Sequence, residues 1–376
     1  MKIFKYHPIN SIESINSIAI NSNQTYIAFG DSNNQITIYK YQNLLLLLSS
    51  QPKQKFNLKN SKEIQCEIIP NSNLQKITFS VQEKVNKISF PHTMNNFLFS
   101  GGSDKLISIW KISKEIFSGE KVKTIILKNE ITDFKFYPTD AFLFVSCIDN
   151  NIYILKCNYS ENSFDIIYTM KEHDNIVNSI VLDPAIEMTG RFASISNKGR
   201  LIISQINFNN FHVKTIKNFN EFVNEKHKCT TINKKIDWSI DGNFLLSVDH
   251  HILKGNKNLM HCRIIFMNNN NYSNNILIGH ESPVFVCKFS KCFYNSKEKK
   301  DSFMLCATCD RNGSVIIWKI KENKFNVFVV IDDYSESNIN DLLWSEDGKI
   351  LFTGNSSGTV GIILFCNLEV LRKKKQ

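Results

Sequence analysis

The sequence lacks the segments that direct a chain into or across a membrane. Its most apolar stretch is the leucine run from Leu44 to Leu48, whereas a helix that spans a bilayer needs about 20 apolar residues. We interpret this run as a buried strand. Residues Met1 to Asn10 mix Lys, His and Pro, and no apolar signal-peptide segment follows them. Ten cysteines without a secretory context indicate reduced thiols of the cytosol or nucleus, not a disulfide framework.

Motifs for catalysis and nucleotide binding are also missing. The sequence contains no P-loop, no G-x-G-x-x-G and no convincing catalytic dyad. Gly354 to Gly358 (GNSSG) matches the nucleophile-elbow pattern, but that motif needs a helix after it, and here a strand follows, so we predict a hairpin turn. Cys287, Cys292, Cys306 and Cys309 have zinc-like spacings, yet strand residues three apart point to opposite faces, which favours buried thiols. We expect no enzymatic activity, cofactor, metal, membrane segment or small-molecule substrate.

The charge is basic but dispersed. The formal net charge is +10, with 45 Lys and Arg against 35 Asp and Glu spread along the chain. This pattern favours an ordinary solvated surface over a dedicated nucleic-acid surface, and DNA contact remains the alternative. The densest basic run, Arg372 to Lys375, is either a frayed terminus or an import or nucleic-acid tail.

An internal repeat is the strongest signal in the chain. Seven short runs with alternating apolar residues recur: Ile36 to Lys40, Ile107 to Lys111, Ile152 to Lys156, Leu201 to Gln205, Cys262 to Phe266, Val315 to Lys319 and Val360 to Leu364. Their fourth residues are separated by 71, 45, 49, 61, 53 and 45 positions. A period near 45 with loop insertions is typical of a four-stranded propeller blade.

Each repeat follows the same order of predicted elements. A turn rich in Asp, Asn and Gly precedes most of the runs, and weaker outer strands follow, such as Val122 to Leu127 and Phe325 to Ile331. Convincing amphipathic helical periodicity is missing. We therefore predict an all-β, seven-bladed β-propeller over residues 1–370, with Met1 to Lys5 closing the last blade. Residues 371–376 form a basic tail.

The Trp-Lys endings and Gly279-His280 resemble WD repeats. In that family a His, a Ser or Thr, an Asp and a Trp form a structural hydrogen-bonded tetrad. The resemblance implies this role for His280, Thr308, Asp310 and Trp318. It implies similar blade anchors elsewhere, and these are Asp104, Trp110, Asp149 and His173. The fourth repeat departs from the pattern because it carries Asn197 and Ser204 beside His173.

An ordered set of segments resembles successive blades of the HIRA histone-chaperone subunit. The segments are Met1 to Lys5, Gly101 to Lys111, Ile131 to Leu155, Leu182 to Pro184, Trp238 to Ser247, Gly279 to Ser290 and Ile339 to Leu351. The resemblance implies a nuclear scaffold in a complex that deposits histones H3 and H4 independently of replication and regulates transcription. The alternatives are the propeller subunit of chromatin assembly factor one, a ubiquitin-ligase substrate receptor and a coat subunit.

The resemblance also sets expectations for partners. Core histones are strongly basic, and a basic chain disfavours direct contact with them, so we expect partners among other histone-chaperone subunits. In the HIRA family a chaperone-binding segment and a second domain follow the propeller, whereas this sequence stops at Gln376. We therefore expect the isolated chain to bind histones or the anti-silencing chaperone weakly. The insertions from Tyr41 to Val85 and from Phe222 to Lys235 are either partner contacts or disordered surface loops.

Overall fold

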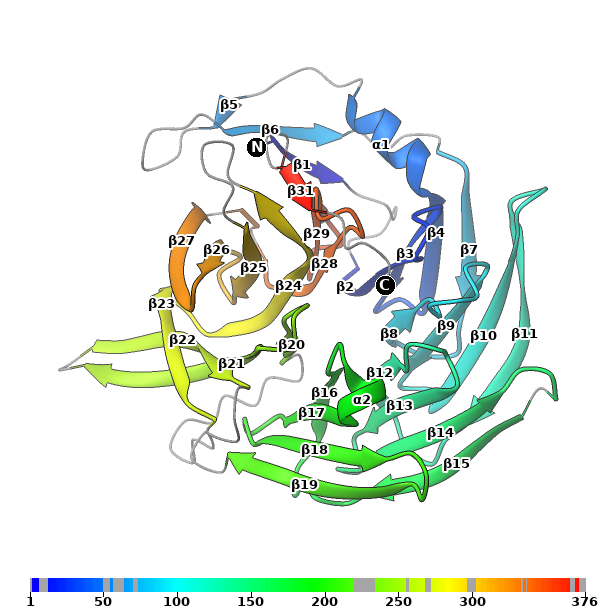
Figure 1. The fold of residues 1–376 in the computed structure, drawn as a ribbon. Coiled ribbons are helices and arrows are strands. Elements are labelled where there is room, and N and C mark those ends of the chain that lie inside the picture. The colour runs from blue at the N-terminus through cyan, green and yellow to red at the C-terminus, as the bar shows by residue number, and fades with distance from the viewer. Residues whose placement is uncertain are drawn as a thin grey trace.

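Seven β-sheets form a closed ring around a central channel (Figure 1). The computed structural model describes residues 2–6, 13–49, 55–56, 64–69, 74–161, 163–219, 234–254, 257–267, 272–295, 302–332, 334–335, 337–365 and 369–371. Each sheet is one blade. The strand of each blade that lies nearest the axis of the ring, here called the inner strand, lines the channel. The predicted seven-bladed propeller is confirmed.

The first four blades follow the chain in order. Blade one contains β2 (Ile15–Ile20), β3 (Tyr26–Asp31), β4 (Gln35–Lys40) and β7 (Lys76–Ser80). Blade two contains β8 (Val85–Ser89), β9 (Phe97–Gly102), β10 (Leu106–Ser113) and β11 (Ser118–Ile126). Blade three contains β12 (Ile131–Phe136), β13 (Phe142–Cys147), β14 (Ile152–Asn158) and β15 (Ser163–Met170). Blade four contains β16 (Val177–Leu182), β17 (Arg191–Ser196), β18 (Leu201–Asn207) and β19 (His212–Phe219).

The last three blades include strands from distant parts of the chain. Blade five contains β20 (Asp237–Trp238), β21 (Phe244–Lys254), β22 (Lys257–Phe266) and β23 (Asn274–His280). Blade six contains β24 (Val284–Asn295), β25 (Ser302–Asp310), β26 (Val315–Lys321), β27 (Lys324–Ile331) and the added β31 (Glu369–Leu371). Blade seven contains β28 (Ile339–Trp344), β29 (Ile350–Asn355), β30 (Val360–Leu364), β1 (Lys2–Tyr6), β6 (Ile64–Ile69) and β5 (Lys55–Phe56).

The hydrophobic core lies between the blades. The buried apolar side chains form seven clusters, and each cluster joins one blade to the next. All seven repeated runs are third strands of blades, and in β10 the residues from Ile107 to Trp110 are all buried. A strand that packs on both faces has a continuous apolar sequence. The side chains of outer strands, such as β11, are mostly exposed or half-buried. The ring therefore holds together by burial of apolar surface at every seam.

The N-terminal strand closes the ring, as predicted. β1 pairs antiparallel with β30, with Ile3 opposite Ile363. On its other side β1 pairs in parallel with β6, with Phe4 opposite Glu67. The insertion between β4 and β7 of blade one thus covers the edge that β1 would otherwise expose, which removes a site for unwanted strand pairing (Figure 1).

The interpretation of Leu44 to Leu48 as a buried strand is wrong. These residues belong to a helix, α1 (Tyr41–Ser49). Leucine is a good helix former and the run has no β-branched residue, so it is free to leave the sheet pattern where blade one's third strand ends. Tyr41 and Leu44 are buried against the seam between blades seven and one, while Leu46 is 67% exposed. A single short apolar run cannot by itself distinguish a strand from a helix.

The remaining elements are short. A four-residue helix, α2 (Ile186–Thr189), ends at Gly190, whose φ of 63° is the left-handed conformation that favours glycine. Leu371, the first residue of the predicted basic tail, ends β31, and the rest of that tail lies outside the described residues. Of the predicted insertion from Phe222 to Lys235, only Lys234 and Lys235 are described. Within the described parts of the chain, no helix is long and apolar enough to cross a membrane.

Candidate functional site

The structure brings the four predicted tetrad residues together at the seam between blades five and six. His280, at the end of β23, lies 3.0 Å through Nδ1 from Asp310 Oδ2 and 2.7 Å through Nε2 from Thr308 Oγ1. Trp318 Nε1 donates to the same Thr308 hydroxyl at 2.8 Å. All four side chains are buried, so each hydrogen bond replaces water that the polar atoms have lost. These hydrogen bonds connect β23 with β25 and β26.

The anchors in blade two act separately from each other. Trp110 Nε1 donates to Ser100 Oγ at 2.9 Å, which reproduces the Trp-to-hydroxyl half of the tetrad. Asp104 instead accepts a hydrogen bond from the Leu106 amide in the hairpin turn. Burial is the largest influence on Asp104 and raises the pKa of its carboxyl above the ordinary value.

The anchors of blades three and four have different partners. Asp149 accepts from Tyr153 OH at 2.6 Å and from Asn129 Nδ2 at 2.9 Å, so it fixes the hairpin between β13 and β14. His173 Nε2 lies 2.7 Å from Ser194 Oγ. Burial, followed by the charge of Arg200, lowers the pKa of His173 to about 4.

The sequence alignment of blade four needs one correction. Ser194 occupies the place of Thr308, so the residue two positions later, Ser196, takes the place of Asp310. Asn197 was the residue expected there. Ser196 Oγ accepts from the Arg200 amide within the turn.

A bulge that was not predicted from the sequence recurs at the start of the inner strands. In β2, β8, β12, β16, β24 and β28, the pairing register shifts by one residue at the same place. A bulge leaves one extra residue unpaired in the ladder and re-aims its side chain. The extra residues are Asn16, Asn86, Thr132, Asn178, Phe285 and Asn340.

The bulged residues and their successors join neighbouring blades. Asn16 Nδ2 donates to the Val85 carbonyl at 2.9 Å, and Asn340 Nδ2 donates to the Ile15 carbonyl at 3.0 Å. One residue further along the strand, Asp341 Oδ2 accepts from the Ile18 amide at 2.8 Å.

The same acceptor position is used in other blades. Asp133 Oδ2 accepts from the Ile180 amide at 3.1 Å, and Ser17 Oγ accepts from the Ile88 amide at 3.2 Å. The triplets INS, VNK, ITD, VNS and IND that begin five of the inner strands are the sequence signal that could have found these contacts.

The inner strands, together with Lys235 just before β20, also place seven charged residues around the channel. This group, here called the channel charge cluster, comprises Lys87, Lys135, Lys235, Lys288, Asp133, Asp237 and Asp341. The channel encloses a cavity of about 660 Å³ whose wall includes all four lysines. Lys235 lies 2.9 Å from Asp341, and Lys288 lies 2.8 Å from Asp237.

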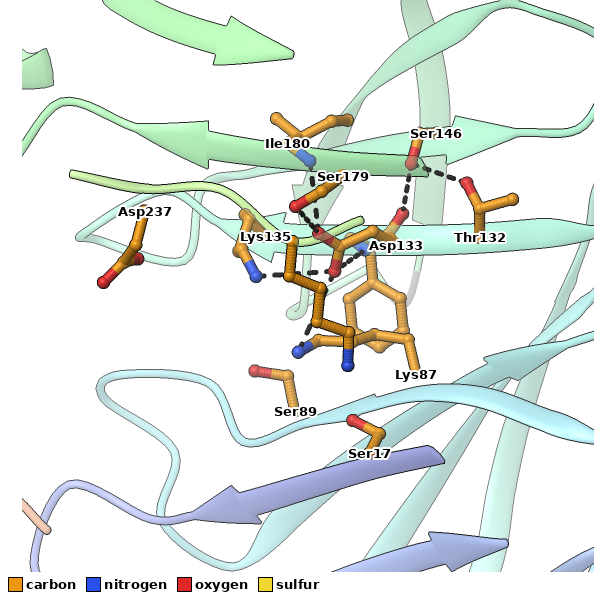
Figure 2. A network of polar contacts seen from close by, with 12 residues as sticks. Ser17, Lys87, Ser89, Thr132, Asp133, Lys135, Ser146, Ser179, Ile180 and Asp237 are labelled. Carbon is orange, nitrogen blue, oxygen red and sulfur yellow. Dashed lines mark hydrogen bonds and ion pairs between the residues drawn. The ribbon is translucent and has the colours of Figure 1, made fainter. Parts of the chain in front are cut away.

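Asp133 is shared by two lysines. Lys87, from β8, and Lys135, from β12, approach the same Asp133 oxygen at 3.8 Å and 3.4 Å (Figure 2). The other Asp133 oxygen accepts from Ser179 Oγ and from the Ile180 amide, both on β16. Asp133 therefore connects three consecutive blades.

Burial and charge together set the protonation of this cluster. Burial lowers the pKa of Lys135 to about 8, even though Asp133 opposes the change. Burial would also lower the pKa of Lys288, but Asp237 outweighs it and raises that pKa to about 12. For Asp341, burial would raise the pKa, yet Lys235 and Lys87 lower it to about 2.

The two sequence motifs weighed for chemistry fall in strands and turns. Gly354 to Gly358 forms the hairpin between β29 and β30, as predicted, and a strand follows it. Cys287 and Cys292 lie on β24, Cys306 and Cys309 on β25, and all four are buried. Across the described ranges, no group of three or more His, Cys, Asp or Glu residues is arranged to hold a metal ion.

Comparison with known proteins identifies the repeats. The family model for the WD domain, G-beta repeat, matches residues 74–111 and 329–363. These segments contain β7 to β10 in blades one and two and β28 to β30 in blade seven. Together with the seven-bladed ring, the match defines the chain as a WD-repeat β-propeller protein.

Among WD-repeat proteins, the chain is similar to fungal proteins of the Hir family. The chain is 24% identical to Protein HIR1 of Candida albicans over 96% of its own length and 41% of that protein. It is 24% identical to Protein HIR1 of Gibberella zeae, with 73% of this chain and 28% of that protein covered. Protein HIR2 of Debaryomyces hansenii is 24% identical over 42% of this chain and 15% of its own length. The chain is thus similar to Hir-family WD-repeat proteins over most of its length, and it spans less than half the length of these relatives.

Proposed function

We propose that this chain is a non-catalytic scaffold subunit of a HIRA-like complex that deposits histones H3 and H4 independently of replication and regulates transcription in the nucleus. The observation that carries the proposal is the similarity to Protein HIR1 of Candida albicans over 96% of the chain. A WD-repeat propeller is a protein-interaction fold whose rigid blades carry loops that recognise partners.

The arrangement of the molecule suits a scaffold. The inner strands are cross-linked from blade to blade by side-chain hydrogen bonds and ion pairs, so the disc presents its faces as one rigid body. The net charge of +10 disfavours direct capture of basic histones. We propose that other chaperone subunits are the direct partners, with the insertion between β4 and β7 of blade one as one contact region.

Affinity purification of the tagged chain from its native cells tests this proposal. Core histones and histone-chaperone subunits should co-purify, and the tagged protein should concentrate in the nucleus. The comparison is a tagged chain without residues 2–6, which lacks the strand that closes blade seven and should recover less of the same partners. Recovery of ubiquitin-ligase or coat components without histones would contradict the proposal and support one of the other propeller functions.

A further inference from the structure

The cavity at the centre of the ring has more positive than negative charge. Among the described residues around the channel, the channel charge cluster contains four lysines and three aspartates. Two of the lysines, Lys87 and Lys135, share Asp133, whereas Lys235 and Lys288 each have a closer carboxylate of their own. When all four amines are protonated, one positive charge in this cluster is left without an equivalent negative charge. Burial lowers the pKa of Lys87 as it does that of Lys135, and Asp133 opposes both changes.

The way these side chains are buried increases that imbalance at the cavity wall. Asp133 is only 4% exposed, and its Oδ2 turns toward the blade that follows, where Ser179 Oγ and the Ile180 amide donate to it. Lys87 and Lys135 are 12% and 23% exposed, and both line the cavity. Both amines therefore belong to residues of the cavity wall, whereas Asp133, which they share (Figure 2), does not line the cavity.

Acidic residues nearer the edge of the cavity have basic partners of their own. Asp183 lies 2.8 Å from the Arg191 guanidinium, and Glu346 pairs with Lys291. These carboxylates therefore offset little of the charge of Lys87 and Lys135. Partly buried amines attract an anion more strongly than amines in open solvent do, because the effective dielectric constant is lower around them.

We propose that Lys87 and Lys135 form an oxyanion-binding site in the central channel. The ligand is a small group with negatively charged oxygens, supplied either by a free tetrahedral anion or by the carboxylate of an Asp or Glu side chain from a partner. The cavity of about 660 Å³ has room for either. This site is independent of the proposed chaperone function.

Binding of two probes by calorimetry tests the site and distinguishes the two sources. The probes are inorganic sulfate, for the free anion, and a short oligoglutamate peptide, with oligoglutamine as its neutral control. Ionic strength is held low and constant, because salt screens such contacts. Saturable binding of either charged probe supports the proposal. Failure of both to bind the wild-type chain overturns it.

Matched variants locate the binding. Lys135→Met removes the charge but keeps the length of the side chain, and we expect affinity for the bound probe to fall at least about tenfold. Lys135→Arg should restore it. Lys111→Met is the control, since Lys111 is an exposed lysine on β10 outside the channel. Equal affinities for wild type and Lys135→Met, with both proteins folded, would refute the assignment.

A pH titration of the wild-type protein keeps the proposal testable if Lys135 variants do not fold. Lys135 is faced by Asp133 on its own strand, Lys87 on β8, Asp237 on β20 and Lys288 on β24. Burial holds its pKa at about 8, whereas sulfate and oligoglutamate keep a constant charge around that pH. Affinity should therefore decrease as the pH rises through about 8. An unchanged affinity across this range would count against Lys135.

Discussion

Replacing Asp341 with Asn tests whether the channel charge cluster holds the ring closed. Asp341 lies on the inner strand of blade seven and accepts the Ile18 amide of blade one at 2.8 Å. Its other oxygen lies 2.9 Å from Lys235 Nζ. An Asn side chain can still accept the amide hydrogen bond, but it leaves the mostly buried Lys235 amine without its carboxylate.

The pKa of Asp341 sets the expected magnitude. Burial would raise this pKa, but Lys235 and Lys87 lower it from 3.8 to about 2. Since one pKa unit corresponds to about 1.4 kcal/mol, the carboxylate contributes roughly 2 kcal/mol to the free energy of unfolding at neutral pH. Because the folded pKa is lowered, this contribution is fully present above the unfolded value of 3.8 and is lost as the pH falls toward 2.

Urea unfolding followed by tryptophan fluorescence measures the effect, since all four tryptophans are buried. At pH 7 the Asp341→Asn variant should be less stable than wild type by roughly 2 kcal/mol, and the difference should shrink as the pH approaches the folded pKa of Asp341. Asp165→Asn is the control because Asp165 is exposed on β15. If Asp341→Asn and Asp165→Asn lose the same free energy at pH 7, the inter-blade ion pair does not stabilise the ring.

Three further predictions concern closure, the tetrad and a buried histidine. Deleting residues 2–6 should lower the melting temperature or cause aggregation, because it exposes the edges of β30 and β6, and unchanged thermal stability would contradict the closure model. Asp310→Ala leaves the buried His280 without its carboxylate and should cost about 1 to 3 kcal/mol in urea unfolding; a neutral effect would show that the tetrad does not stabilise blade six. Burial holds the pKa of His173 at about 4, below 6.5, so stability should fall as the pH drops from 6.5 toward 4, by about 2 kcal/mol near pH 5. His173→Gln should remove this dependence, and an identical pH profile in the variant would count against it.

The fold could be predicted because its signals are local. Alternating apolar runs such as Ile107 to Lys111 and turns such as GGSDK mark the third strand and hairpin of a blade within about a dozen residues. Their recurrence at a period near 45 then indicates the number of blades. The same locality explains why the four tetrad residues could be named, since their pattern repeats within one unit.

The helix α1 and the central channel could not be predicted in this way. Leu44 to Leu48 is compatible with a helix or a strand on local propensity, and the contact of Tyr41 with the seam near Phe352 favours the helix only after the ring has closed. Lys87 and Asp341 are far apart in the sequence, and each alone reads as an ordinary charged residue on a strand.

By itself the sequence determined the repeated β-strand pattern, the seven blades and the strand that closes them, because apolar periodicity and turn residues act over short distances. The tertiary structure decided which charges meet in the channel. Ring closure brings the inner strands of separate blades around one cavity. There, the burial of each lysine amine and the carboxylate beside it set the pKa of that amine. Electrostatic energy depends on distance and burial in space, and separation along the chain predicts neither.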